Sequence, residues 1–125
     1  MHKDTRFSIH GRVKSFQYAF EGIFRFFRTD HNAWLHMAAA IGVGVLANIV
    51  GVTRTEAIVI LIAIALVWIT EMLNTCIEKA MDMITTEYDV RVKVIKDISA
   101  GAVLVAAIAA LIIGLIVFVP KFIYV

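Results

Sequence analysis

The sequence predicts an all-α integral membrane protein, with an N-terminal amphipathic surface helix followed by three transmembrane helices. Of its 125 residues, 61% are apolar, and the mean hydropathy is +0.86. Soluble domains are typically about 45–50% apolar, and one of this size could not bury so much apolar surface. Long stretches with few charges are the second observation, because lipid leaves helices as the only reasonable form for them. We expect one membrane domain over residues 1–125.

The surface helix is expected within residues 1–32, which carry charges throughout and lack the unbroken apolar core of a signal peptide. We therefore expect this segment to be retained. Its aromatic and aliphatic residues recur at helical spacing, at Phe16, Phe20, Ile23, Phe24 and Phe27. Polar residues take the opposite side, which predicts a helix lying in the cytoplasmic interface. Such a helix could be a simple anchor, could wall a lipid-facing cleft, or could do both.

Three stretches are expected to cross the bilayer, over residues 33–52, 56–84 and 97–119. The first is apolar apart from His36 and Asn48. The uncharged part of the second, residues 57–70, is shorter than the roughly 20 residues that a crossing helix needs. Its helix must therefore continue through Glu71 and the polar residues beyond it. The third stretch carries no charge after its first turn.

Short connections are expected between the spans. Thr53 and Glu56 fit a capping box that opens the second helix. A polar connection over residues 85–97 precedes the third helix, and Pro120 follows its expected end. The third span also carries a row of small residues, which either lets helices pack closely within or between protomers or reflects ordinary alanine-rich composition. The row is Ala102, Ala106, Ala110 and Gly114.

The distribution of basic residues predicts the topology. They gather before the first span and around the second connection, at Lys3, Arg6, Arg12, Lys14, Arg25, Arg28, Lys79, Arg91, Lys93 and Lys96. The first turn holds only Arg54, and the C-terminal tail holds Lys121. Because cytoplasmic loops carry an excess of Lys and Arg, we expect the N-terminus and the second connection in the cytoplasm and the C-terminus outside.

Polar residues line one side of the expected second helix. At 100° per residue, Glu78 and Asp82 fall within about 20° of Glu71, and Asn74 lies about 60° away. Glu71 stands where the helix is still inside the membrane or at its inner edge. Ionisable residues there are costly, and they are functional candidates by default. The three carboxylates would repel one another unless a cation were bound.

This acidic stripe points to phosphoryl-transfer chemistry. Mg²⁺ is typically held by one or two carboxylates together with substrate phosphates, and a carboxylate in an apolar setting suits a general base that deprotonates an alcohol. Lys96 and Asp97 open the third span at the same level, where Lys96 could either neutralise phosphate oxygens or snorkel to the interface. Asp30 fits a helix cap. The sequence contains neither a P-loop nor the motifs of protein kinases.

Two other function classes remain open at this point. A small oligomeric proton-coupled transporter would also use Glu71 as a membrane carboxylate. It would not need Glu78, Asp82, Lys96 and Asp97 to gather at one face. A structural subunit of a larger complex is the third alternative.

The segment from Glu71 to Asp82, with the stretch from Lys96 to Leu104, resembles the prokaryotic diacylglycerol kinase family, which includes the undecaprenol kinases. The spacing E-x-x-N-x-x-x-E-x-x-x-D followed by K-D-x-x-x-x-A-V-L is specific to that family. The resemblance covers nearly the whole chain, including Phe16, Tyr18, Ala19 and Gly22. It implies a homotrimer in the bacterial inner membrane, with a cytoplasmic N-terminus and sites shared between protomers. Such an enzyme phosphorylates a membrane lipid alcohol from Mg-ATP.

The resemblance also implies residue roles. Glu71 would be the general base, and Asn74 would help to position the reacting groups. Asp30 and Glu78 would hold the Mg²⁺ on ATP. The expected ATP-binding residues are Tyr18, Asp30, Glu78, Glu87, Tyr88, Asp89, Lys96 and Asp97.

This chain departs from the family pattern at three positions. Glu is usual where Asp30 stands, which shortens that metal ligand, and a basic residue is usual where Trp34 stands. His36 resembles the undecaprenol-kinase branch, whereas the diacylglycerol branch typically carries Glu there. Together with Gly101, His36 favours a polyprenol substrate.

Overall fold

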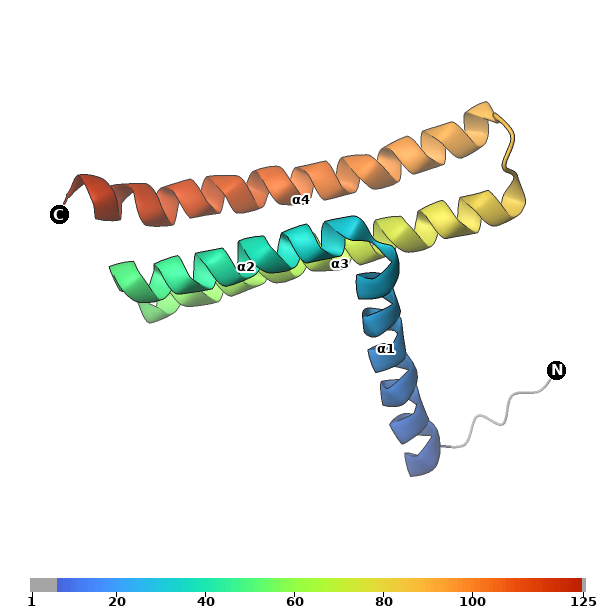
Figure 1. Ribbon diagram of the computed structural model, residues 1–125, viewed down its shortest axis with the longest axis horizontal. Coiled ribbons are helices and arrows are strands. Elements are labelled where there is room, and N and C mark those ends of the chain that lie inside the picture. Colours follow the sequence, from blue (N-terminus) through green and yellow to red (C-terminus); the bar gives the residue numbers. More distant parts are fainter. Residues whose placement is uncertain (1–6, 125) are drawn as a thin grey trace. The chain divides into compact units, whose positions relative to one another are not determined.

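The computed structural model describes residues 7–124 and folds them into four α-helices, with no strand in that range (Figure 1). The helices are α1 (Ile9–Thr29), α2 (His31–Val50), α3 (Arg54–Ile84) and α4 (Val90–Ile123). Helices α2, α3 and α4 are each long and apolar enough to cross a membrane, which confirms the predicted fold class. The chain forms two compact units, one ending at Trp34 and the other beginning at Leu35. Lys3 and Arg6 lie outside the described residues.

Helix α1 has defined ends. The Ser8 hydroxyl accepts a hydrogen bond from the Gly11 N–H at 3.2 Å, and the Asp30 N–H donates to the Phe26 carbonyl at 3.0 Å. Most large apolar side chains of α1 are exposed, whereas Phe26 is buried. Phe27 packs edge-on against Trp34, with 5.5 Å between the ring centroids. The exposed aromatic side of α1 is the kind of surface that a membrane interface covers.

Helices α2 and α3 are joined by a tight turn. The Gly51 N–H donates to the Ala47 carbonyl at 3.1 Å, and Gly51 has a φ of +72°, which glycine adopts without steric cost. Thr53 then caps α3, because its hydroxyl oxygen accepts from the Glu56 N–H at 3.2 Å. This confirms one half of the expected capping box. In the other half, the Glu56 carboxylate accepts from the Thr53 hydroxyl and pairs with Lys121.

Helices α3 and α4 form an antiparallel pair whose connection is shorter than the sequence analysis expected. The expectation of a polar connection as far as residue 97 was wrong, because α4 already begins at Val90. Asp89 caps this helix by accepting from the Arg91 N–H at 2.8 Å. At the other end, α4 continues through Pro120. Proline lacks the N–H that residue 120 would donate to the Ile116 carbonyl, so α4 makes one backbone hydrogen bond fewer at this point.

The lengths of α3 and α4 exceed the thickness of the hydrocarbon core. Their 31 and 34 residues correspond to about 46 and 51 Å at 1.5 Å per residue, against about 30 Å of hydrocarbon. Part of the α3–α4 pair must therefore lie beyond the apolar layer. The expected limits of the membrane segments, and the expectation of a single domain, stay predictions.

The second unit buries few side chains. The buried apolar residues of its helices are Ile60, Ala63, Ala106 and Val117. Of the row of small residues on α4, Ala106 is buried, Ala110 and Gly114 line a pocket, and Ala102 is exposed. Most other large apolar side chains face outward, as expected where lipid or further protein is the surrounding medium.

Candidate functional site

Glu71 is the most deeply buried carboxylate of the described residues. It lies on α3, and only 4% of its surface is exposed. Its Oε2 atom is 3.8 Å from Nε2 of His36 on α2. The His36 ring in turn lies 6.5 Å from the Trp68 ring, centroid to centroid. An ionisable group this buried in an apolar helix needs polar neighbours, and His36 supplies one.

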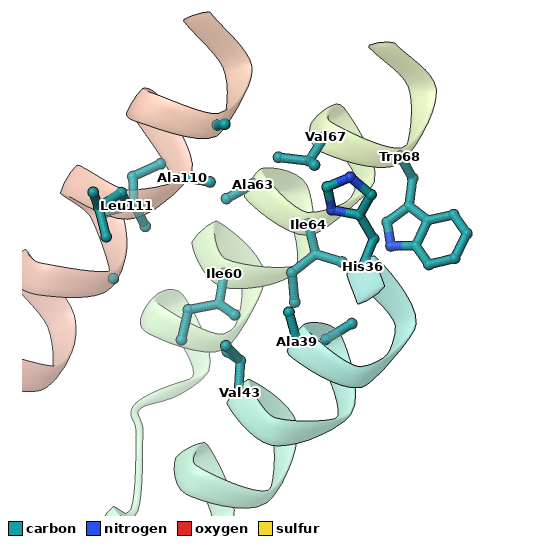
Figure 2. A pocket seen from close by; sticks show the side chains of 14 residues that line it. His36, Ala39, Val43, Ile60, Ala63, Ile64, Val67, Trp68, Ala110 and Leu111 are labelled. Carbon is teal, nitrogen blue, oxygen red and sulfur yellow. The ribbon is translucent and has the colours of Figure 1, made fainter. Parts of the chain in front are cut away.

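An apolar pocket of about 290 Å³ opens beside this pair, between α2, α3 and α4 (Figure 2). His36 and Trp68 form part of its wall. The remaining wall consists of small and aliphatic side chains, among them Ala39, Val67 and Ala110. The pocket can therefore accept an apolar chain, and His36 in its wall lies 3.8 Å from the buried Glu71 carboxylate.

Asn74 lies one turn beyond Glu71 on α3 and is held from α4. The Ser99 hydroxyl donates a hydrogen bond to Oδ1 of Asn74 at 2.7 Å. Ser99 itself is buried, with 7% of its surface exposed. Because Ser99 occupies Oδ1 of Asn74, the NH₂ group of Asn74 points away from Ser99. The sequence analysis singled out Asn74 but missed Ser99. A hydroxyl in an otherwise apolar helical stretch was the signal that could have revealed it.

The outer part of the acidic stripe lies on the extension of α3 beyond Glu71. Glu78 is about 10 Å and Asp82 about 16 Å farther along the helix axis. Glu78 is exposed and makes no hydrogen bond or ion pair with residues 7–124. Asp82 accepts from Nζ of Lys96 at 2.7 Å, across the α3–α4 pair. Helical periodicity predicted that these acids share one face of α3. It did not identify Lys96 as the partner of Asp82.

The start of α4 holds the remaining candidates of the second unit. Lys93 pairs with Asp97 one turn away, with 2.6 Å between Nζ and Oδ2. Glu87 and Tyr88 are exposed in the connection. Asp89 forms a two-point ion pair with Arg91, at 3.2 and 2.9 Å. The hydrogen bonds from Arg91 lower the pKa of Asp89 to about 2.

Two candidates belong to the first unit. Tyr18 lies on α1 with 62% of its surface exposed. Asp30 stands between α1 and α2, where its Oδ1 accepts from the Asn32 N–H at 2.9 Å. This hydrogen bond confirms that Asp30 is a helix cap, the role that its position alone favoured.

Comparison with known proteins identifies the family. The family model described as prokaryotic diacylglycerol kinase matches residues 17–118. The chain belongs to this family. It is 39% identical over 119 residues to the undecaprenol kinase of Bacillus subtilis (strain 168), covering 95% of this chain and 97% of that protein. It is also 37% identical over 101 residues to a diacylglycerol kinase of Synechocystis, covering 80% of this chain and 58% of that protein.

Membership of the prokaryotic diacylglycerol kinase family decides among the function classes left open by the sequence. The chain is an enzyme, a lipid kinase with membrane-spanning helices, rather than a proton-coupled transporter or a structural subunit. A kinase implies a nucleotide as the phosphoryl donor. In an enzyme of this kind, the buried carboxylate, the apolar pocket and the exposed acids are candidate parts of a site for phosphoryl transfer.

A magnesium ion is compatible with the donor set of this kinase. No group of three or more His, Cys, Asp or Glu side chains converges among residues 7–124. Mg²⁺ does not need such a cage, because it is usually bound by one or two carboxylates plus substrate phosphates. The exposed carboxylate of Glu78 offers oxygen ligands of this kind.

Proposed function

We propose that this kinase transfers the γ-phosphoryl group of ATP to the hydroxyl of a membrane lipid, with undecaprenol preferred over diacylglycerol. The match to an undecaprenol kinase over 95% of this chain supports the preferred substrate. His36 and Gly101, the two residues that favour the polyprenol branch, support it further.

The burial of Glu71 beside an apolar pocket is the observation that carries this proposal. A lipid alcohol has an apolar chain, which fits the apolar pocket. It also has a hydroxyl group, which must reach a base. Glu71 takes the hydroxyl proton on its carboxylate. The lipid oxygen bonds to the γ-phosphorus as the bond from that phosphorus to the β–γ bridging oxygen breaks, and ADP leaves. Asn74 orients the reacting groups, since this reaction depends mainly on positioning and charge neutralisation.

The nucleotide is proposed to bind where α3 and α4 extend beyond the apolar layer. Glu78 would hold Mg²⁺, and Asp30 is the second proposed ligand from the family resemblance. Bound there, the ion would neutralise phosphate charge. Lys96 would add a positive charge near the phosphates. The other proposed nucleotide contacts are Tyr18, Glu87, Tyr88, Asp89 and Asp97.

The resemblance also supports a homotrimer in the bacterial inner membrane with a cytoplasmic N-terminus. The charge bias around the second connection agrees with this orientation, because that connection joins the ends of α3 and α4 that carry the proposed nucleotide site. In this orientation the proposed nucleotide site faces the cytoplasm, where ATP is available.

The test is ATP-dependent phosphate transfer by purified protein in mixed micelles, with Mg²⁺ and with undecaprenol and diacylglycerol offered side by side. The wild type is expected to label undecaprenol faster. Glu71→Gln keeps the size of the side chain but removes the base, so we expect kcat to fall by about 10²–10⁴-fold. Glu21→Gln, at an exposed position of α1, is the matched control and should remain active.

Two results would contradict these proposals. Full activity of a well-folded Glu71→Gln enzyme would remove Glu71 from the role of base. Faster labelling of diacylglycerol would overturn the substrate preference while leaving the kinase activity in place.

A further inference from the structure

His36 occupies an unusual place in the second unit. It stands in the second turn of α2, and its side chain is 25% exposed while that of Glu71 is 6% exposed. Its Nε2 atom lies 3.8 Å from Oε2 of Glu71, and its ring is tilted by 60° against the Trp68 ring. Figure 2 shows the imidazole and the indole next to each other at the pocket. The imidazole is thus held between an aromatic ring and the proposed base.

The other surroundings of His36 are apolar. Around the pocket, α2 contributes Ala39 and Ala40, and α4 contributes Ala107, Ala110 and Leu111. Of the acids farther along α3, Asp82 is paired with Lys96 and Glu78 is exposed about 10 Å beyond Glu71 along the axis. Within the second unit, Glu71 is therefore the acidic group that faces the imidazole.

We propose that His36 is a positioning residue for Glu71 and holds its carboxylate in the orientation that the transfer needs. This inference rests on the proposed role of Glu71 as the base. A neutral imidazole can donate its Nε2–H to Oε2 of Glu71, and this contact fixes the direction of the carboxylate. The separation of 3.8 Å is longer than an ordinary hydrogen bond of about 2.7–3.2 Å, and catalytic hydrogen bonds often tighten in the reacting complex.

The test compares kcat and the KM for ATP of the wild type, His36→Gln and His36→Leu, with undecaprenol and Mg-ATP in mixed micelles. Glutamine keeps an uncharged N–H donor, whereas leucine keeps only bulk. We expect His36→Leu to lower kcat by about 10²-fold, as misplacement of a catalytic group does. His36→Gln should recover about tenfold of this loss, the effect of one hydrogen bond. In both variants the KM for ATP should stay unchanged.

A spectroscopic measurement tests the contact between His36 and Glu71 independently of the kinetics. In protein labelled with ¹⁵N-histidine, Glu71→Gln should shift the imidazole resonances of His36 and leave those of His10, on the exposed face of α1, in place. His10→Gln is the matched control for the kinetics and should keep the kcat and the KM of the wild type.

The outcomes distinguish this inference from the proposed function. If the wild type transfers phosphate and both His36 variants keep its kcat, His36 does not position Glu71. A loss of kcat that is equal in the two variants would show a structural role only and would also overturn the inference. If the wild type phosphorylates neither lipid, the proposed function itself fails, and this inference fails with it.

Discussion

Replacing Ser99 by alanine tests whether α4 positions Asn74 on the proposed catalytic face of α3. The Ser99 hydroxyl is buried and donates to Oδ1 of Asn74 at 2.7 Å. Hydrogen bonds between helices in membrane proteins average about 0.6 kcal/mol and reach about 1.7 kcal/mol. The bond is short and its donor is buried, so we expect Ser99→Ala to lower the free energy of unfolding by about 1 kcal/mol, toward the upper half of that range.

The same substitution should reduce activity more than stability. Without the Ser99 hydroxyl, the Asn74 amide is free to rotate, and its NH₂ group no longer keeps one direction. Loss of one positioning hydrogen bond of about 1.4 kcal/mol corresponds to about a tenfold fall in kcat. The KM for ATP should change little, because the pair lies on the lipid side of the proposed nucleotide site.

The assay is a double-mutant cycle over Ser99 and Asn74, read both by unfolding in detergent and by lipid phosphorylation. We expect a coupling energy of about 1 kcal/mol, because contacting residues are not additive. Ser15→Ala, at an exposed position on α1, is the control and should behave as the wild type. Additive effects in the cycle, together with a kcat of Ser99→Ala equal to that of the wild type, would refute the reasoning.

Three further predictions concern the charged groups at the ends of α3 and α4. Asp82→Asn should lower the KM for ATP by about fivefold, the equivalent of about 1 kcal/mol, because Lys96 loses its partner at 2.7 Å; an unchanged or higher KM in steady-state kinetics would contradict this. Lys121→Met breaks the pair with Glu56 at 3.0 Å and should reduce stability in detergent unfolding by up to about 1 kcal/mol. Lipid-kinase activity should not change, because Glu56 stands 15 residues before Glu71 on α3, about 22 Å away along the helix axis. The pKa of Asp89 is lowered to about 2, so the stability contributed by this cap is complete above about pH 4 and is lost as the pH falls through about 2; an NMR titration of its carboxyl with a midpoint near 4 would disprove this.

Much of the fold follows from periodicity and hydropathy alone. The three membrane-length helices are predictable because lipid removes every alternative to the helix for a long apolar run. The start of α4 at Val90 was not predictable in the same way. Val90 and the residues that follow it form a polar segment, so hydropathy assigned them to a connection. Their helix is stabilised by the Asp89 cap and by the Lys93–Asp97 pair. Both are local polar interactions, which a hydropathy pattern does not record.

The candidate site was also predictable only in part. Features that depend on a single helix follow from the sequence, whereas contacts between helices do not. Helical periodicity is enough to place Glu71, Asn74 and Glu78 on one side of α3, since 100° per residue is a property of the backbone. The partners from other helices, Ser99 and His36, depend on how the helices align lengthwise, which no single helix encodes. The burial of Glu71 follows from that alignment, because α2 brings His36 to its level. Helix α2 begins at His31, five residues before His36, whereas α3 continues 13 residues beyond Glu71 to Ile84. The change along α3 from the buried Glu71, the proposed base, to the exposed Glu78, the proposed metal ligand, therefore fits the greater length of α3 compared with α2.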